Sequence, residues 1–528
     1  MNFMDKDNTV DMKSVRCNLK DLYPAFLLLA LAVACYWKMF DNYFFLDDTN
    51  GVFAGYLLSH DITKIFTYSF EAIYMSPLRR VVVALSYIPN YLISGYDPWS
   101  YYLTNLLLHF GNSFLVYLIV KKLSDNKNLA LLTAVLFSAS LNKADAVMMI
   151  AHRTTLMGAF FALLSIFLYI RIIMEGYNRR LFLYTLLSFV AALGSYETGL
   201  VLPGIFIVLG LIYKGRNFFK KELLLVNASF LSLVIILVLF LGLQPGVAVA
   251  ETSLVGRIYH IFRNVLAVFP SFIIPPFVLQ QPNEVYHSTS TYLGWIELFS
   301  LVLIGLIVAV NLRIRDRLVY FGLIFFLIMA IPTSSVNWAY YPEYSFHRIR
   351  FSIGKYSYLS SFGYYIIAGT LLHKLYCYLS ARCTRPRLIK AVSSVLLGIF
   401  IVFNISLLYH REKMWEFVAK MTKAQIDFLI SLDIKQNHYH KIYSSGNDQF
   451  IYSKHVESLL RVIHKNTDIT VQDFSKESKP DAGKKELLFI TADGKMVAID
   501  YDKKYLIKQS ELPLKVPPFL LSIKPTRL

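Results

Sequence analysis

Two adjacent carboxylates, Asp47 and Asp48, directly follow the first long apolar segment of the chain, in the stretch YFFLDDTNGVFAG at residues 43–55. A carboxylate at a membrane surface can act as a general base toward an incoming hydroxyl group. The alternative interpretation is a polar helix end that only marks the boundary between lipid and water. The long polar segment that follows favours the first interpretation, because it supplies further ionisable groups: His60, Glu71, Arg79 and Arg80.

The arginines of this segment add a second kind of chemistry. A guanidinium group can donate two parallel hydrogen bonds to a phosphate, and it stays charged at any physiological pH. A general base beside Arg79 and Arg80 therefore suits the transfer of a group from a lipid phosphate to a hydroxyl.

Three polar residues lie inside the second apolar segment, in the stretch YYLTNLLLHFGN. Asn105, His109 and Asn112 are spaced by four and three residues, so on a helix they share one face. Polar groups within a membrane span are costly and usually face the protein interior or a cavity. Hydrogen bonding between helices explains each of them equally well.

More ionisable residues recur in later segments that we predict on the same side of the membrane. Glu197 lies in such a short connection that it could simply cap the following helix, at the positive end of the helix dipole. Together these residues indicate repeated acidic and basic groups on one membrane face: Lys143, Asp145, His152, Arg153, Glu197, His347, Arg348, Arg350 and Lys355.

The composition indicates a membrane protein with many spans. The 528 residues are 56% hydrophobic and only 17% charged, and the mean hydropathy is +0.48. Soluble chains are about 45–50% apolar and about 25% charged. The net charge of +18 comes from Lys and Arg that cluster in short loops. No nucleic-acid-binding motif accompanies this charge, so we expect no nucleic acid partner.

Apolar runs near the length that crosses a ~30 Å hydrocarbon core predict eleven spans. The stretch 256–279 is apolar but broken by prolines, which predicts a re-entrant or interfacial element rather than a twelfth span. The predicted spans are 22–40, 100–120, 129–141, 155–173, 181–194, 199–213, 222–243, 291–310, 318–332, 357–373 and 391–409.

Charge predicts the orientation of these spans. The loops on the side of the N-terminus are rich in Lys and Arg, which places that side in the cytoplasm. The chain then divides into a cytoplasmic N-terminus (1–21), a membrane domain (22–409) whose first external loop is 41–99, and an extracytoplasmic C-terminal domain (410–528). The pattern of this last part predicts a strand at KIYSSGN, a helix at HVESLLRVIHKN and a second strand at DITVQDF. It also predicts a β-hairpin at KELLFITADGKMVAID.

The order and spacing of several motifs resemble those of a known superfamily. They are FFLDDTNGVF, the Asn-x-x-x-His span, the segment LNKADAVMMIAHRTTLMG with its arginine, YETGLVLP and YSYLSSFGYY. The chain resembles the GT-C membrane glycosyltransferases, and most closely the transmembrane O-mannosyltransferases that carry lumenal tetratricopeptide repeats. The resemblance covers residues 22–215 well and 318–425 more loosely. The repeats are absent, and the family's His-Pro in the second external loop is Ser140-Leu141 here.

This resemblance implies a mainly α, polytopic GT-C-like bundle, to which the residue patterns after residue 410 add a small α/β domain in place of the repeats. It implies inverting transfer of a sugar from a polyprenyl-phosphate donor to a hydroxyl of a protein, lipid or glycan on the extracytoplasmic face. Asp47 or Asp48 would be the base, with a divalent Mg or Mn ion as a possible helper. The phosphate would be held by Arg79, Arg80, Arg153 and Lys355, and the supporting polar residues would be Asn105, His109, Asp145 and Glu197.

Two other classes of function remain open at this stage: a transporter or flippase of lipid-linked sugars, and a non-catalytic scaffold that presents the C-terminal domain to a partner. Transporters tend to have inverted repeats and matched broken spans, and the sequence shows no convincing pair. Identification of the lipid-linked sugar that co-purifies with the protein would separate these classes. No Asn-x-Ser/Thr sequon falls in a predicted external segment, which favours a bacterial inner membrane over the endoplasmic reticulum.

The orientation can be tested by accessibility. We expect a cysteine placed at Gly483 to react with a membrane-impermeant thiol reagent in spheroplasts, because an odd number of spans puts the C-terminal domain outside. A cysteine at Asn126 serves as the matched control and should be protected. Labelling at Asn126 with protection at Gly483 would invert the orientation and place Asp47 and Asp48 in the cytoplasm.

Overall fold

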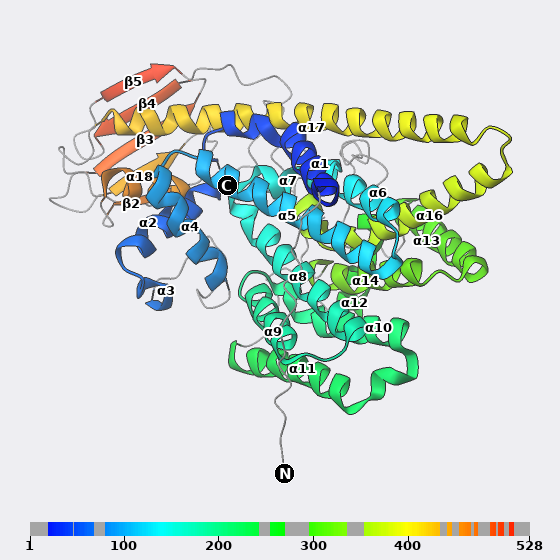
Figure 1. The fold of residues 1–528 in the computed structure, drawn as a ribbon. Coiled ribbons are helices and arrows are strands. Elements are labelled where there is room, and N and C mark those ends of the chain that lie inside the picture. Colours follow the sequence, from blue (N-terminus) through cyan, green and yellow to red (C-terminus); the bar gives the residue numbers. More distant parts are fainter. Residues whose placement is uncertain are drawn as a thin grey trace, which may run out of the picture.

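The computed structural model describes residues 19–45, 47–67, 80–241, 254–269, 295–334 and 353–432, followed by shorter C-terminal stretches at 441–445, 453–465, 469–473, 486–492, 495–500 and 506–511. Helices dominate the chain, and a small sheet lies at one end of the helical part (Figure 1). This confirms the prediction of a mainly α, polytopic fold with a small C-terminal sheet.

Every predicted span coincides with a helix. Within the described part of the chain, seven helical segments are long and apolar enough to cross a membrane. There are eight such segments if α6 and the bent segment after it, Leu141–Met148, form one span. The helices α9, α14 and α16 do not meet the criteria of length and hydropathy that define a candidate span. The helices are α1 (Leu19–Tyr36), α5 (Trp99–Ser124), α6 (Lys127–Ser138), α8 (Arg153–Glu175), α9 (Arg179–Leu193), α10 (Leu202–Lys214), α11 (Lys221–Leu241), α13 (Trp295–Ile314), α14 (Arg317–Ser334), α16 (Ser361–Arg382) and α17 (Pro386–Ile430).

Local sequence explains where several of these helices begin. The side chain of Asn126 accepts hydrogen bonds from two backbone N–H groups at the start of α6, and Asn178 does the same for α9. Asn is among the best residues at this position, because its side chain satisfies N–H groups that have no partner inside the helix. Pro203 lies in the first turn of α10, where a missing N–H group has no cost.

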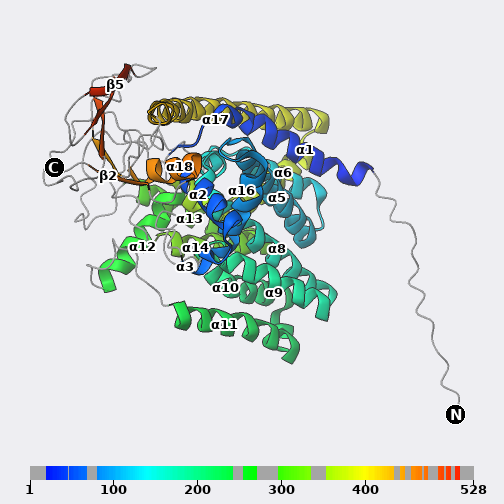
Figure 2. The same cartoon turned by 90° about the vertical axis from the view of Figure 1, so that its left-hand side faces the viewer.

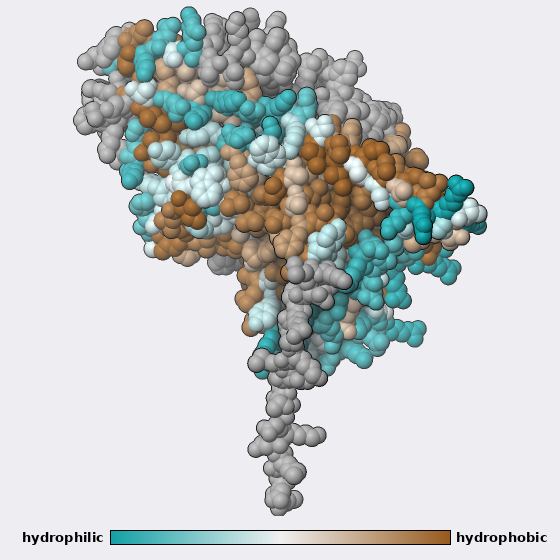
Figure 3. Space-filling model, turned by 45° about the horizontal axis from the view of Figure 1, so that its top comes forward, coloured by the Kyte–Doolittle hydropathy of each residue, from teal (hydrophilic) through white to brown (hydrophobic). Residues whose placement is uncertain are grey.

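The surface of the helical part suits a lipid environment. On the face shown in Figure 3, hydrophobic residues form a broad zone over the helices, and hydrophilic residues gather toward opposite ends. Large apolar side chains on this part are strongly exposed, including Leu239 at 79%, Val302 at 71% and Val402 at 68%. An apolar surface of this extent would drive aggregation in water, so we assign it to contact with lipid.

The segment predicted as the first external loop contains three helices in its described part: α2 (Asp48–His60), α3 (Lys64–Thr67) and α4 (Val81–Ser94). The short turn η1 (Trp37–Asp41) connects α1 to this segment. Glu71 and Arg79 lie outside the described residues. The predicted interfacial element at 256–279 includes α12 (Leu254–Val268), and its residues from 270 onward also lie outside the described part.

The longest helix, α17, links the two parts of the molecule. It has 45 residues, so it continues well past the predicted span at 391–409. The predicted domain boundary at residue 410 therefore falls inside a continuous helix. In Figure 1, α17 crosses the whole molecule and ends beside the C-terminal sheet.

The C-terminal elements follow the predicted order. They are β1 (Lys441–Ser445), α18 (Ser453–His464), β2 (Thr470–Asp473), β3 (Glu486–Ala492), β4 (Lys495–Asp500) and β5 (Leu506–Glu511). The sheet order is β2-β1-β3-β4-β5, where β1 pairs in parallel with β2 and β3, and the other pairs are antiparallel. Parallel β1 and β2 need a crossover connection, and α18 supplies it.

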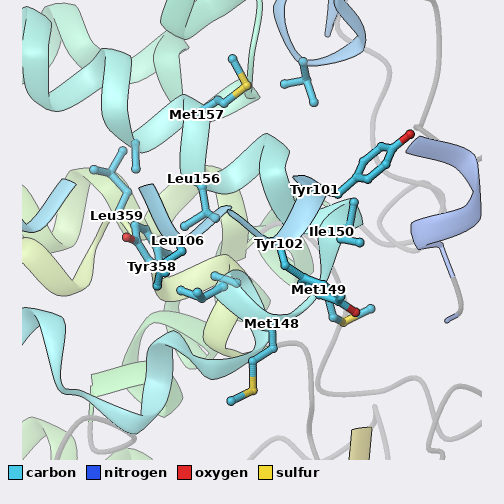
Figure 4. Packing of buried hydrophobic residues seen from close by; sticks show 14 of the residues in the cluster. Tyr101, Tyr102, Leu106, Met148, Met149, Ile150, Leu156, Met157, Tyr358 and Leu359 are labelled. Atoms are coloured by element: carbon cyan, nitrogen blue, oxygen red, sulfur yellow. The ribbon is translucent and has the colours of Figure 1, made fainter. Parts of the chain in front are cut away.

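A buried hydrophobic core includes residues next in sequence to several predicted site residues. It includes Tyr101, Tyr102 and Leu106 of α5 and residues 148–150, which belong to the turns between α6 and α8 (Figure 4). These turns are η4 (Leu141–Lys143), α7 (Ala144–Met148) and η5 (Ile150–His152). Leu156 and Met157 of α8 and Tyr358 and Leu359, which follow α15 (Ile353–Ser357), complete this part of the core. Apolar packing therefore fixes the turns that carry several predicted site residues.

Candidate active site

The two aspartates at the start of α2 have different environments. Asp48 is fully buried, whereas Asp47, which precedes the helix, is partly exposed. Oδ1 of Asp48 accepts a hydrogen bond of 2.8 Å from the backbone N of Ala151. Among the described residues, no donor reaches Oδ2 of Asp48. Burial raises the pKa of the Asp48 carboxyl well above its ordinary value, because the charged form loses its contact with water.

Asn105 holds the same turn that Asp48 contacts. Its side-chain Nδ2 donates to the backbone oxygens of Met149 at 2.9 Å and Val147 at 3.3 Å. The turn around Ala151 is therefore fixed from two sides, by the first helix of the external segment and by α5. Asn105 acts on the site through the backbone that it positions.

Arg153 lies fully buried at the start of α8, and each of its three nitrogens donates to a protein oxygen. Nε donates to Oδ1 of Asn105 at 3.2 Å, Nη1 to Oδ1 of Asn90 at 2.6 Å, and Nη2 to the backbone oxygen of Tyr101 at 3.0 Å. The guanidinium group also lies 4.3 Å from the centre of the Tyr87 ring. This geometry joins α4, α5 and α8, and it gives no support to the predicted role of Arg153 as a phosphate ligand.

His109 and Asn112 share one face of α5, as the spacing predicts, and both contact Tyr358. His109 Nδ1 lies 2.7 Å from the Tyr358 hydroxyl, and its Nε2 lies 3.1 Å from the backbone oxygen of Ser138. Asn112 Nδ2 donates to the same hydroxyl at 3.2 Å and to the backbone oxygen of Leu156 at 3.1 Å. The geometry is that of hydrogen bonding between helices, which was one of the two interpretations of these residues.

Arg80 and Glu197 form an ion pair between two segments that are far apart in the sequence. Nη2 of Arg80 lies 2.8 Å and 2.9 Å from the two carboxylate oxygens, and Nε donates to the nearer one at 3.3 Å. The guanidinium group also lies 5.2 Å from the centre of the Tyr196 ring. Glu197 opens the turn η6 (Glu197–Val201) and is more exposed, at 44%, than Arg80, at 12%. Glu197 therefore orients Arg80 rather than only capping α10.

Asp145 also has a cationic partner. Its Oδ1 accepts a hydrogen bond of 3.0 Å from Nη2 of Arg411 on α17. Its backbone oxygen lies 2.7 Å from Nδ1 of His152. Lys355, on α15, is close enough to Asp145 for the two charges to interact. Asp145 is thus a connection between α7, η5 and α17.

Three predicted site residues converge near His152. Asp47, Arg80 and Lys355 all lie close enough to its imidazole ring for their charges to influence it. They come from the start of α2, the start of α4 and α15. The structure therefore brings one partly exposed carboxylate and two cations, from three separate segments, within electrostatic range of His152, whereas Asp48 and Arg153 are fully buried.

The sequence pointed to some of these residues and missed others. The sequence marks His152 only as one of many ionisable residues, and it assigns no role to Asn90 or Arg411. Asn90 carried a usable signal, because it is an isolated amide inside the apolar run VVVALSYIPNYLIS. His60 lies at the far end of α2 from Asp48, with Nδ1 2.8 Å from the backbone oxygen of Tyr56. The described residues contain no group of three or more His, Cys, Asp or Glu that could hold a metal ion.

The amino-acid sequence was compared with family models and with curated proteins, and it is similar to curated O-mannosyl-transferases. No family model matches the chain. The chain is 28% identical over 161 residues to human protein O-mannosyl-transferase TMTC3, which covers 29% of this chain and 17% of that protein. It is 34% identical over 92 residues to Xenopus laevis protein O-mannosyl-transferase tmtc2, which covers 17% of this chain and 11% of that protein. The matches confirm the expected resemblance, and the chain spans less than a fifth of the length of these curated relatives.

Among solved structures, the chain is similar to ArnT from Cupriavidus metallidurans, whose crystal structure contains undecaprenyl phosphate. The two share 12% sequence identity with a TM-score of 0.45, over 89% of this chain and 93% of that one. A similarity this distant does not inform function.

The burial of Asp48 predicts a pH-dependent stability. Because its pKa is raised in the folded protein, the stability that its protonated form contributes is complete below the ordinary carboxyl pKa of about 3.9 and is lost as pH rises toward the folded value. Asp48→Asn removes this titration. We therefore expect the Tm of the variant, minus that of the wild type, to increase with pH above about 4, measured on the purified protein in detergent.

Asp61→Asn is the control for this experiment. Hydrogen bonds from Thr63 lower the pKa of the exposed Asp61, so the stability that its charged form contributes is complete above the ordinary carboxyl pKa of about 3.9. The Tm difference between Asp61→Asn and the wild type should therefore stay constant above about pH 4, where the difference for Asp48→Asn increases. A Tm difference for Asp48→Asn that does not change with pH would contradict the assignment of Asp48 as a buried, readily protonated acid.

Proposed function

We propose that the chain is a glycosyltransferase that moves a sugar from a polyprenyl-phosphate donor to an acceptor hydroxyl, with inversion, on the extracytoplasmic face of the membrane. The curated relatives are named O-mannosyl-transferases, which supports the class of reaction. The observation that carries the proposal is that a partly exposed carboxylate, Asp47, and two cations, Arg80 and Lys355, lie within electrostatic range of His152, with Arg80 oriented by its ion pair to Glu197. A base and two cations are the groups that such a transfer requires.

Asp47 is the better candidate for the general base. It is partly exposed, whereas Asp48 is buried and uses Oδ1 to hold the turn at Ala151. Asp47 would take the proton of the acceptor hydroxyl as its oxygen attacks the anomeric carbon. The bond between that carbon and the phosphate oxygen breaks on the opposite face, which inverts the configuration and releases the polyprenyl phosphate.

Arg80 and Lys355 would stabilise the negative charge that develops on the leaving phosphate. One well-placed group of this kind typically contributes about 3 kcal/mol to the transition state. Glu197 keeps the guanidinium group of Arg80 in a fixed orientation before the donor binds. A fixed cation is more effective than a mobile one, because it does not have to be ordered during the reaction.

The structure does not favour the transporter alternative. Such proteins tend to have broken helices at matched positions in two halves of the chain. The described residues contain one such bent pair, formed by α6 and the segment Leu141–Met148, with an angle of 60°. A single broken pair is not the matched arrangement, so we retain the transferase proposal.

The different environments of the two aspartates lead to a graded prediction. Asp47→Asn should lower the rate of sugar transfer by about 10²–10⁴-fold, the usual effect of losing a general base. Asp48→Asn should have a much smaller effect, because an amide resembles the protonated acid and can still accept the hydrogen bond from Ala151. Transfer is measured on purified protein, with lipid-linked sugars extracted from the native membrane as donors.

Asp61→Asn is the matched control, since it neutralises an exposed acid just beyond the other end of α2. It should leave transfer unchanged. Near-normal transfer by Asp47→Asn would remove Asp47 as the base, and a loss confined to Asp48→Asn would assign that role to Asp48.

The two proposed phosphate ligands can be tested by binding alone. Arg80→Gln and Lys355→Gln should each weaken the binding of undecaprenyl phosphate by about 10-fold or more, since each removes one charge-assisted hydrogen bond. Lys64→Gln, on an exposed lysine of α3 that pairs with Asp61, is the control and should bind normally. Unchanged binding by both Arg80→Gln and Lys355→Gln would show that the phosphate lies elsewhere.

A further inference from the structure

Helix α2, which begins with the acidic pair, lies between two other helices. Its Gly51 and Gly55 face α4 so closely that a Cβ atom at either position would lie 2.7 Å from an atom of Tyr87. α18 of the C-terminal domain contacts α2 as well, and both ribbon views show the two helices side by side (Figures 1 and 2). Eleven residues of α2 are buried, from Asp48 to Leu58.

The contact between α18 and α2 includes specific polar groups. The hydroxyl of Ser458 donates to Oδ1 of Asn50 at 3.1 Å. Asn50 is only 5% exposed and lies two residues after Asp48. One turn further along α2, the ring of Phe53 lies 5.8 Å from the guanidinium carbon of Arg461. Both contacts fall in the half of α2 that carries the acidic pair.

The side of α18 that faces α2 is itself held firmly on the sheet. Arg461 forms an ion pair of 2.8 Å with Glu457, and its Nε donates to the backbone oxygen of Ile469 at 2.8 Å. Glu457 in turn accepts a hydrogen bond from the backbone N of Val471 on β2 at 2.8 Å. Displacement of α18 would therefore break contacts with β2 as well as with α2.

A second connection fixes the sheet to the membrane domain. Nζ of Lys508 on β5 donates to the hydroxyl of Ser431 at 2.7 Å, just after the end of α17. The rings of Phe428 and Phe489 lie 5.7 Å apart, between α17 and β3. The C-terminal domain is thus attached both to the end of α17 and to α2. It therefore holds α2 in a fixed position relative to α17.

We propose that the C-terminal domain contributes to the rate of sugar transfer. Through Ser458 and Arg461 it positions α2, and α2 in turn positions the carboxylates of Asp47 and Asp48. This inference rests on the proposed function for its catalytic consequence. Ser458 is a positioning residue in this scheme and touches no substrate. Because a misplacement of about 1 Å can cost 10²-fold in rate, a contact outside the reacting groups can control the reaction.

Ser458→Ala tests the inference with two measurements. Loss of one hydrogen bond should speed hydrogen exchange at the amides of α2 by about 2–10-fold. The same variant should lower kcat for sugar transfer by about 10-fold and leave the KM for the lipid donor unchanged, because the donor contacts are intact. Ser458→Thr, which keeps the hydroxyl, should restore both values.

Two further variants distinguish a specific effect of Ser458 on the position of α2 from a general loss of stability in the C-terminal domain. Ser510→Ala makes the same change on β5, at the opposite edge of the sheet from α18, and should behave as wild type. Asn50→Ala combined with Ser458→Ala should be no worse than Asn50→Ala alone, since both remove the same bond. Additive effects of these two variants would contradict a shared contact.

The outcomes distinguish this inference from the proposed function. Exchange in α2 that is unchanged by Ser458→Ala overturns the inference, and so does faster exchange with an unchanged kcat. If the wild type transfers no sugar, the proposed function fails, and the exchange measurement alone decides whether α18 holds α2. Faster exchange limited to α2 would then support the structural coupling without its catalytic consequence.

Discussion

The buried guanidinium group of Arg153 is the interaction on which the site depends. It lies where α4, α5 and α8 meet, and it bonds to neutral oxygens on the first two. A buried charge is tolerated only where hydrogen bonds and nearby charge compensate for lost water. Here side-chain and backbone oxygens of Asn90, Asn105, Tyr101 and Ser86, together with the face of the Tyr87 ring, provide that compensation. Separation of these helices would leave the donors of a buried cation without partners, which favours the arrangement seen here.

That arrangement explains why the acidic pair is asymmetric. Ala151 lies two residues before Arg153, so the turn that bonds to Asp48 is fixed by the same network. Asp48 is therefore held within the protein, and its neighbour Asp47 is left at the partly exposed start of α2. Two identical side chains that are adjacent in sequence thus acquire different burial and different hydrogen-bond partners. Environment, rather than residue type, separates an anchoring acid from a candidate base.

The C-terminal domain adds a second level of support. α17 carries the chain continuously from the membrane domain to the sheet, and α18 brings the sheet back onto α2. The loop that follows the first helix is therefore held by the last domain of the chain, more than 400 residues away. The hydrogen bond from Ser458 to Asn50 spans 408 residues. A contact of this kind makes the small domain part of the geometry of the site, instead of an appended module.

The sequence by itself determined much of the architecture. Apolar runs of membrane-spanning length predicted where each long helix lies, because the lipid core sets both length and composition. Alternating patterns and turn residues predicted the strand, helix and hairpin of the C-terminal domain, since these depend on local geometry. The spacing of Asn105, His109 and Asn112 predicted their shared face for the same reason.

The sequence could not determine which partner each polar residue contacts in the folded chain. Arg80 and Glu197 are 117 residues apart, Asp145 and Arg411 are 266 apart, and no local pattern relates either pair. Arg153 stays a predicted phosphate ligand, but a sequence does not show that protein oxygens already accept hydrogen bonds from its three nitrogens. The predicted boundary at residue 410 falls inside α17, because polar residues can continue a helix as well as begin a new domain. Only the tertiary structure decided these points, since burial and partner choice are set by contacts between segments that are distant in the chain.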